Sequence, residues 1–456
     1  MAAVNITVSQ YIADSYNHAD TVTILDTAAN LGSLTAGQIG NLVTNGVEFI
    51  NSSNDVISWD VSQWQAVPTS GLGFDANDLK VVFDTGANIA GLTVGDLGDL
   101  NAFGVTQINP SDDVATLTAA QYGALGGISL DQSADVTLAD TGANISGLSA
   151  AEFGALSIKG FDHIDASDDA FSLSVDQALG LGSVTIDGTD TVTLADSGAN
   201  IAALSTTQIA SLGDAGITIV DATDNVLDLT VAQGFAGFLH GMELTDADFV
   251  TVVDTGANIS AVDASDMDNL GADGFDKIDA TDNAYTLSVA QGEALAASGV
   301  ASSTDDVITV ADTGANLAGL STGDISALGG YGVDVIDSTT DAVSFSVAQL
   351  GALNTAEIGL TAGDTVTLFD TATNVDAITN GSLQGYVNQG VDIIDASDNG
   401  AYSFDVAGAN IFLDNNISAE SNDTVTVADT GANIAGLSAS DFSSLGEKGF
   451  DALDAS

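Results

Sequence analysis

Aspartate side chains recur in this sequence at fixed spacings, and oxygen ligands in such a pattern suit a hard divalent cation. The richest groups belong to a string typified by D-A-T-D-N, at Asp279 to Asn283. Carboxylate and amide oxygens are the ligands that calcium prefers. The pattern therefore predicts calcium as a cofactor, held in four copies of the string. The candidate ligands are Asp165, Asp168, Asp169, Asp221, Asp224, Asp279, Asp282, Asp395 and Asp398.

The same residues have a second interpretation as turn chemistry. Asp and Asn side chains accept hydrogen bonds from backbone N–H groups where a strand ends, and they tolerate tight turns. The chain also lacks the D-x-D-x-D-G pattern of an EF-hand loop. Two interpretations stay open at this point: a ladder of Asx turns, and calcium bound between stacked carboxylates that would otherwise repel one another.

The acidic strings belong to an internal repeat with a period of 56–59 residues. The second string, type B, starts 25 residues after each copy of the first string, type A. The repeat predicts one continuous array over residues 1–456, with a partial unit at 1–19 and a truncated last repeat at 429–456. The type A string, D-T-G-A-N or a close variant, starts at Asp26, Asp84, Asp140, Asp196, Asp254, Asp312, Asp370 and Asp429.

Each half-unit carries a strand signal and a helix signal. β-Branched residues precede the leading Asp, as in the run 250–253. Nine residues after that Asp, a Ser, Thr or Asp is followed in nearly every half-unit by Gln, Glu or Asp three residues later, which is the spacing of a capping box; in the unit at Asp395 one inserted residue moves the Asp to 405. Such pairs include Thr35/Gln38, Ser149/Glu152, Ser205/Gln208, Ser288/Gln291, Ser346/Gln349 and Ser438/Asp441.

The alternation of strand and helix signals determines the expected fold. Repeated βα units require parallel strands joined by right-handed crossovers. We therefore predict an α/β repeat, a right-handed parallel β/α solenoid of about sixteen strand–turn–short-helix half-units. Tandem (βα)8 barrels are the alternative.

The composition excludes several classes of function. The chain has 64 acidic residues against 4 basic ones, giving a net charge of −60. Nucleic-acid binding needs Lys and Arg to neutralise phosphates, and an anionic membrane surface would repel this chain. There is no Cys, and no apolar run is long enough to span a bilayer, so we expect no membrane insertion.

The repeats contain sequence strings that are similar to those of a known class of repeat proteins, for example in the runs 191–213 and 274–291. They resemble tandem repeats of large, acidic, Cys-free bacterial surface proteins, namely S-layer-like proteins and RTX-type adhesins exported by type I secretion. The resemblance covers essentially the whole chain, although the chain lacks the nonapeptide arrays of RTX proteins. It implies an extracellular or cell-surface location and a dependence on calcium.

These observations predict a non-enzymatic structural protein, because no unit breaks the repeat with a cluster of acid and base groups. We expect a surface-layer, matrix or filament-forming component. Neither end shows a polar cap, which predicts head-to-tail self-association unless the ends are boundaries within a larger protein. The alternatives are an adhesin stalk, or a ligand-binding solenoid that recognises ice, a polysaccharide or a cell-surface partner.

Overall fold

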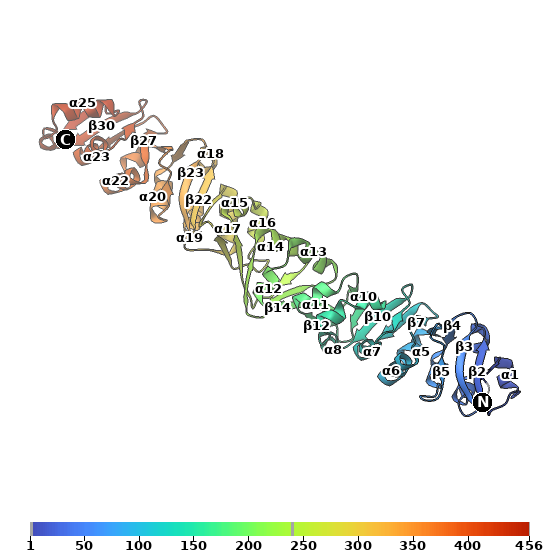
Figure 1. Ribbon diagram of the computed structural model, residues 1–456. Coiled ribbons are helices and arrows are strands. Elements are labelled where there is room, and N and C mark those ends of the chain that lie inside the picture. Colours follow the sequence, from blue (N-terminus) through green and yellow to red (C-terminus); the bar gives the residue numbers. More distant parts are fainter. Residues whose placement is uncertain (1–2, 239–240, 456) are drawn as a thin grey trace. The chain divides into compact units, whose positions relative to one another are not determined.

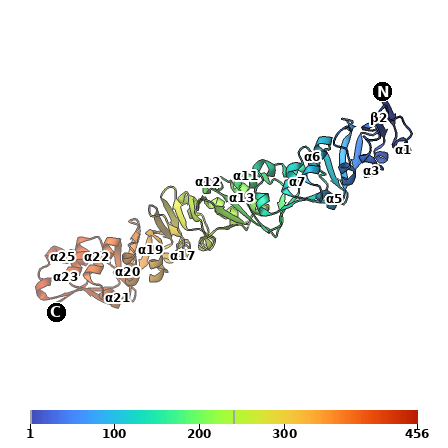
Figure 2. The ribbon, with the colours of Figure 1, turned by 90° about the horizontal axis from the view of Figure 1, so that it is seen from below.

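Short parallel strands alternate with short helices throughout the computed structural model, which describes residues 3–238 and 241–455 (Figure 1; Figure 2). Residue contacts divide the chain into two compact units. The first comprises Met1–Asn225 with Ala236–Ala247, and the second comprises Val226–Phe235 with Asp248–Ser456. Both units are built from the same two kinds of half-unit, which we call type A and type B coils.

The described strands form eight small parallel sheets, seven with four strands and one with three. A typical sheet has the order β8 (Val114–Leu117), β10 (Asp135–Asp140), β11 (His163–Ala166) and β13 (Thr185–Ile186). These four strands come from four successive coils. No sheet closes into a barrel in the described part of the chain, and each unit is a solenoid-like stack of coils.

A type A coil contains a two-residue strand, a turn, a six-residue strand and then helices. Residues Asp135–Leu138 of β10 pair with β8, and residues Thr137–Asp140 pair with β11, so the long strand joins both neighbours. The D-T-G-A-N string then starts a helix, α8 (Gly142–Ser146), because the Thr141 side chain caps the N–H of Asn144. The expectation of a plain turn followed by one capped helix is therefore wrong for type A.

A type B coil contains two strands separated by a tight turn, where the sequence predicted one. After β11 comes β12 (Ala170–Leu173) and then helix α11 (Val175–Gly180). The turn is closed by Asp169, whose φ of +57° is in the left-handed region that Asp and Asn tolerate. The equivalent residues also have positive φ; they are Asp55, Asp113, Asn225, Asn283, Asp341 and Asn399.

The predicted capping boxes are confirmed. All six pairs named from the sequence form the reciprocal hydrogen bonds of a capping box. Behind these caps, the inward side chains of strands and helices form the core, as with Val136, Leu138, Ile145 and Phe153, which are fully buried. Because inward and outward side chains alternate along each strand, this alternation determines which polar residues lie at the strand ends within each coil.

The remaining elements are grouped by their place in the coil. The other long type A strands are β2 (Thr21–Asp26), β6 (Leu79–Asp84), β14 (Thr191–Asp196), β18 (Phe249–Asp254), β22 (Val307–Asp312), β26 (Thr365–Asp370) and β30 (Thr424–Asp429). The short type A strands are β5 (Gly73–Phe74), β9 (Ser129–Leu130), β17 (Glu243–Leu244), β21 (Ala301–Ser302), β25 (Gly359–Leu360) and β29 (Ser418–Ala419). The first type B strands are β3 (Val47–Ser52), β7 (Gln107–Pro110), β15 (Ile219–Ala222), β19 (Lys277–Ala280), β23 (Val333–Ser338), β27 (Val391–Ala396) and β31 (Ala452–Ala455). The second type B strands are β1 (Ala3–Ile6), β4 (Val56–Trp59), β16 (Val226–Leu229), β20 (Ala284–Leu287), β24 (Ala342–Phe345) and β28 (Ala401–Phe404).

Helices follow the same grouping. The first type A helices are α2 (Ala28–Leu31), α5 (Gly86–Ala90), α12 (Gly198–Ala202), α15 (Gly256–Ser260), α18 (Gly314–Ala318), α21 (Ala372–Asp376) and α24 (Gly431–Ile434). The later type A helices are α3 (Ala36–Gly40), α6 (Val94–Phe103), α9 (Ala150–Phe153), α10 (Leu156–Lys159), α13 (Thr206–Asp214), α16 (Ala264–Asn269), α19 (Thr322–Tyr331), α22 (Asn380–Gln389) and α25 (Ala439–Glu447). The type B helices are α1 (Val8–Ile12), α4 (Val61–Gln65), α7 (Ala119–Ala124), α14 (Val231–Phe238), α17 (Val289–Ser298), α20 (Val347–Thr355) and α23 (Val406–Asp414).

Candidate functional site

The leading Asp of every type A string joins two successive coils. In Asp140, Oδ1 accepts hydrogen bonds from the Thr141 N–H at 2.8 Å and from Asn144 Nδ2 at 2.7 Å. Its Oδ2 accepts from the N–H of Ala119, at the start of a helix in the preceding coil, at 3.1 Å. The other seven carboxylates make the same three bonds; they are Asp26, Asp84, Asp196, Asp254, Asp312, Asp370 and Asp429.

These hydrogen bonds favour the ionised carboxylate. Burial raises the pKa of Asp140, but the bonds from Asn144, Thr141 and Ala119 together lower it more, so its pKa lies below the usual value. The same balance lowers the pKa of Asp196. Asp140 and Asp196 are therefore charged groups that accept hydrogen bonds between coils.

The nine type B candidates are Asp169, which closes its turn with a positive φ, and two sets of four. Asp165, Asp221, Asp279 and Asp395 lie at the ends of the first type B strands. The other set lies in the turn and caps the helix of the preceding type A coil: the Oδ1 atoms of Asp168, Asp224, Asp282 and Asp398 accept from the N–H groups of Gly142, Gly198, Gly256 and Ala372 at 2.6–2.9 Å. The turn set therefore has a structural role as helix caps, and one oxygen of each carboxylate is already used.

The surroundings of these candidate residues can be compared with the arrangement that a calcium site needs. No group of three or more His, Asp or Glu side chains in the described part of the chain is arranged to hold a metal ion. Asp279 instead lies 3.3 Å from the ammonium group of Lys277. The pKa of Asp395 is raised by burial and by the nearby charges of Asp423 and Glu420. Calcium binding at these residues stays a prediction.

A further Asp column lies six residues before the type A string, and six of its members are buried: Asp78, Asp190, Asp248, Asp306, Asp364 and Asp423. Asp190, 5% exposed, uses Oδ2 to accept from the N–H of Ala166 at 2.9 Å, while its buried Oδ1 has no hydrogen-bond partner among the described residues. Burial raises its pKa, and the charges of Asp165, Asp187 and Asp169 add to that rise against the hydrogen bond from Ala166. Asp306 has the same arrangement and a raised pKa.

A glutamine column connects coils in a way that the sequence reasoning missed. Gln121 completes the capping box of α7 through Oε1, and its Nε2 donates to the carbonyls of Ala90 at 2.9 Å and Leu92 at 2.7 Å in the preceding coil. Gln63, Gln177, Gln291 and Gln349 make the same pair of bonds. The sequence contains a signal for this column: type B coils have Gln at this position except in α23, which has Gly408, whereas type A coils use Gln, Asp, Glu or Ser.

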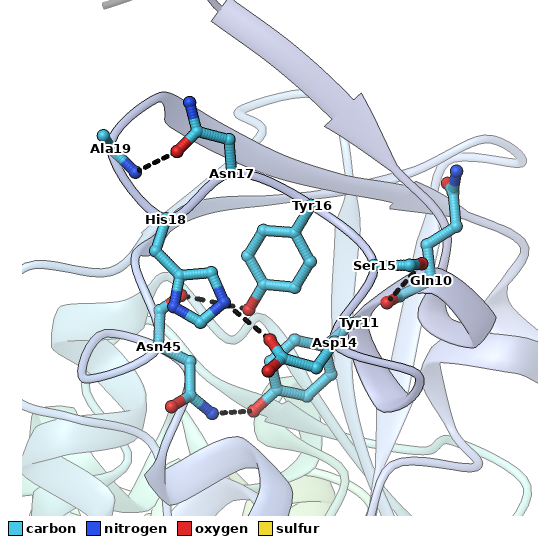
Figure 3. Close-up of polar contacts among 9 residues, drawn as sticks. All are labelled: Gln10, Tyr11, Asp14, Ser15, Tyr16, Asn17, His18, Ala19 and Asn45. Atoms are coloured by element: carbon cyan, nitrogen blue, oxygen red, sulfur yellow. Dashed lines mark hydrogen bonds and ion pairs between the residues drawn. The ribbon is translucent and has the colours of Figure 1, made fainter.

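The first coils carry a polar cluster that has no equivalent elsewhere in the repeat (Figure 3). The Tyr16 ring stacks on His18 at 4.6 Å between centroids, and His18 Nε2 lies 2.6 Å from Asp14 Oδ1. The hydroxyl of Tyr16 donates to the carbonyl of Asn45 at 3.0 Å. These contacts hold the segment 14–18 against the coil that follows it.

The surface hollows differ in their lining: one of about 350 Å³ is lined by Asp254, Asp263 and Asp266, among others, and one of about 470 Å³ by Tyr11, Asp14 and His18, among others. A hollow of about 610 Å³ beside α19 and α20 is lined by small residues such as Ser326 and Gly351, and Glu357 is its one ionisable lining residue within the described chain. No described helix is long and apolar enough to cross a membrane.

Comparisons with known proteins give no family for this chain. No protein-family model matches the sequence, and no curated protein matches it. Among solved structures, the chain is similar to the leucine-rich-repeat ectodomain of the Arabidopsis receptor kinase HAESA, solved in complex with an extended IDA peptide hormone ligand. That match has 10% identity and covers 91% of this chain and 67% of the receptor chain, with a TM-score of 0.17.

Proposed function

We propose that this chain is a non-enzymatic structural protein, a component of an extracellular surface layer, matrix or filament. One observation carries the proposal: the recurring carboxylates of the type A strings are used to join coil to coil. In Asp140, both oxygens accept hydrogen bonds, and the bond from Ala119 reaches into the preceding coil. Repeated polar residues that act as connectors fit a load-bearing scaffold better than a reaction centre.

The acidic composition supports an assembly that depends on cations. A net charge of −60 makes copies of the chain repel one another at low ionic strength. Salt or a divalent cation relieves that repulsion, and the resemblance to calcium-dependent bacterial surface proteins points to calcium and to the cell exterior. An adhesin stalk and a polysaccharide-binding solenoid are the alternatives.

Electron microscopy of the purified chain tests the proposal. We expect regular filaments or sheets to form at millimolar calcium or at about 0.5 M NaCl, which is above physiological ionic strength, and to disperse at low ionic strength. Chains that stay dispersed under all these conditions would contradict a layer-forming or filament-forming role and favour the stalk. Binding to a polysaccharide array without self-assembly would favour the ligand-binding alternative.

A further inference from the structure

The sequence contains three Asn–Gly pairs, at Asn45–Gly46, Asn380–Gly381 and Asn399–Gly400. An Asn in such a pair can lose its amide group spontaneously, because the backbone nitrogen of the glycine can attack the side-chain carbon of the asparagine without a Cβ in the way. The attack requires the peptide unit between the two residues to rotate. The hydrogen bonds that hold each pair therefore decide which of the three can react in the folded chain.

The peptide unit between Asn399 and Gly400 is free of hydrogen bonds. The pair lies in the tight turn of a type B coil, where Asn399 is exposed and has a φ of +50°. Gly400 is an insertion, because the other second type B strands begin directly after the left-handed residue, as Ala284 follows Asn283. Within the described residues, the Gly400 N–H donates to no acceptor and the Asn399 carbonyl accepts from no donor.

The insertion has moved a backbone hydrogen bond away from the asparagine. The Thr424 N–H donates to the carbonyl of Gly400 at 3.3 Å, whereas the carbonyl of Asn283 itself accepts from the Val307 N–H at 3.0 Å. A Cβ added to Gly400 would lie 2.5 Å from the Cβ of Ala372, so only glycine fits without a shift of the backbone. The coil therefore keeps a glycine after an asparagine whose carbonyl is unbonded.

The Asn399 side chain is also bonded in a way that favours the attack. Its Oδ1 accepts from Asn422 Nδ2 at 2.9 Å, which draws electron density away from Cγ. Its Nδ2, the nitrogen that leaves, donates to no acceptor in the part of the chain that the structure describes. In the equivalent Asn283, Nδ2 donates to the carboxylate of Asp305 at 3.1 Å, and that bond holds the nitrogen in place.

The pair Asn45–Gly46 is held on every side. The Gly46 N–H donates to the carbonyl of Val43 at 3.0 Å, and the Asn45 carbonyl accepts from the Tyr16 hydroxyl at 3.0 Å. Asn45 Nδ2 donates to the hydroxyl of Tyr11 at 3.2 Å. The same two amino acids are therefore locked at one place and free at another.

The pair Asn380–Gly381 is held by a helix. The two residues begin α22, which fixes their backbone angles. Asn380 Nδ2 donates to both carboxylate oxygens of Asp405, at 2.9 Å and 3.1 Å. Asn399 is thus the one member of the three pairs whose peptide unit and leaving nitrogen are both unbonded within the described residues.

We propose that Asn399 is a site of spontaneous deamidation, which proceeds through a cyclic succinimide formed with the backbone nitrogen of Gly400. That nitrogen bonds to Asn399 Cγ, the Cγ–Nδ2 bond breaks, and the amide leaves as ammonia with the proton that the Gly400 nitrogen gives up. Water then opens the ring. Attack of water at Cγ gives aspartate, and attack at the backbone carbonyl carbon of residue 399 gives isoaspartate.

The two products differ in their effect on the coil. Aspartate occupies the same turn position, with positive φ, at Asp55, Asp113, Asp169 and Asp341, so the fold accepts it. Isoaspartate adds one carbon to the backbone of the turn, which displaces the Gly400 carbonyl from the Thr424 N–H and loosens the pairing of β28 with β30. Both products add one negative charge. A long-lived chain thereby becomes more acidic at one coil as it ages.

Incubation of the folded chain at mildly alkaline pH and body temperature tests the proposal. Peptide mapping by mass spectrometry gives the deamidated fraction at each asparagine over time. Asn399 should react at about ten times the rate of Asn45, Asn380 and Asn283, or faster. In guanidinium chloride, where the fold no longer holds them, the three Asn–Gly pairs should react at similar rates.

An Asn399→Asp variant separates the two products. This variant mimics the aspartate product, so it should melt like the freshly prepared original chain. The aged original chain should melt lower, in proportion to the isoaspartate at position 399 that a protein isoaspartyl methyltransferase labels.

Three results would overturn the proposal. They are equal rates at Asn399 and Asn45 in the folded chain, an Asn399 that reacts only in guanidinium chloride, and an Asn399 that reacts under neither condition. None of them bears on the structural role proposed above, because that role depends on contacts between coils that the turn at Asn399 does not make.

Discussion

The carboxylate of Asp140 accepts three hydrogen bonds, whereas that of Asp190 accepts one and buries its other oxygen without a partner in the described chain. The two residues are the same amino acid in neighbouring columns of the repeat. Their pKa values move in opposite directions because hydrogen bonding outweighs burial at Asp140 and burial dominates at Asp190. Their contributions to stability should therefore differ in sign at neutral pH.

Replacing the coil-joining carboxylate should destabilise the chain. In the Asp140→Asn variant, the side-chain NH2 group faces one of the backbone N–H groups that donate to the carboxylate, so that hydrogen bond is lost. We expect a loss of about 1–3 kcal/mol, seen as a lower urea midpoint. Asp228→Asn is the matched control, because Asp228 is exposed on β16, and its midpoint should be unchanged. Equal midpoints for the two variants would contradict a connecting role for Asp140.

Replacing the buried carboxylate should have the opposite effect. A folded-state pKa above the unfolded value means that the charge of Asp190 destabilises the fold at pH 7 and that stability is gained as pH falls through the folded pKa. Asp190→Asn keeps an oxygen for the Ala166 N–H and removes the charge, so it should raise the melting temperature at pH 7. The gain should vanish near pH 4. A variant that melts lower at both pH values would refute this account.

The sequence predicted these side chains in part. Spacing alone located the Asp columns and their preference for turns and caps, because both follow from local backbone chemistry. It could not show that Asp140 reaches Ala119, or that Gln121 reaches Ala90 and Leu92, because those partners are set by how one coil stacks on the next. The choice between calcium ligands and helix caps at Asp168 likewise depended on the position of Gly142.

At the scale of elements, a helix start packs against the strand of the following coil. A Cβ added to Gly142, at the start of α8, would lie 1.9 Å from the carbonyl oxygen of Ala170 in β12. A Cβ added to Gly431, at the start of α24, meets nothing closer than 3.9 Å. The same sequence motif is therefore crowded in an inner coil and open in the last one.

This difference predicts unequal effects of one substitution. Gly142→Ala should lower the urea midpoint by an amount equal to about 3 kcal/mol, because backbone must move. Gly431→Ala should leave the midpoint of the dispersed chain unchanged or slightly higher, since Ala favours a helix over Gly. Circular dichroism in urea at low protein concentration checks both. Comparable losses in the two variants would show that the coil stacking at Gly142 is described wrongly.

The elements also show where local patterns are sufficient and where they fail. The capping boxes were predicted correctly because both partners lie three residues apart in one segment. The second type B strand was missed because β12 is short and is separated from β11 by a turn whose left-handed residue, Asp169, does not stand out from the other Asp residues in the sequence. The helix after D-T-G-A-N was missed because it has only one turn.

At the scale of the whole molecule, electrostatic repulsion opposes the cohesion that the contacts between coils provide. The chain carries −60 at pH 7, with only four Lys to offset it. Hydrogen bonds through Asp140 and Gln121 act over a few ångströms, whereas the repulsion among acidic residues extends over the Debye length. Ionic strength therefore shifts the balance between cohesion and repulsion in each unit without altering a single contact.

Salt and calcium should stabilise the chain in separable ways. Raising NaCl from 0.01 M to 1 M shortens the Debye length from about 30 Å to about 3 Å and should raise the melting temperature progressively. Calcium held by the type B carboxylates adds a second effect, since binding only to the folded state stabilises it further.

The comparison is therefore made at constant ionic strength, with millimolar CaCl2 against MgCl2 and against NaCl alone. A further increase with calcium that magnesium does not reproduce would support binding at residues such as Asp279 and Asp395, whereas identical melting in all three salts would leave these carboxylates with turn and capping roles alone. Insensitivity to NaCl itself would contradict the view that net charge limits the stability of this fold.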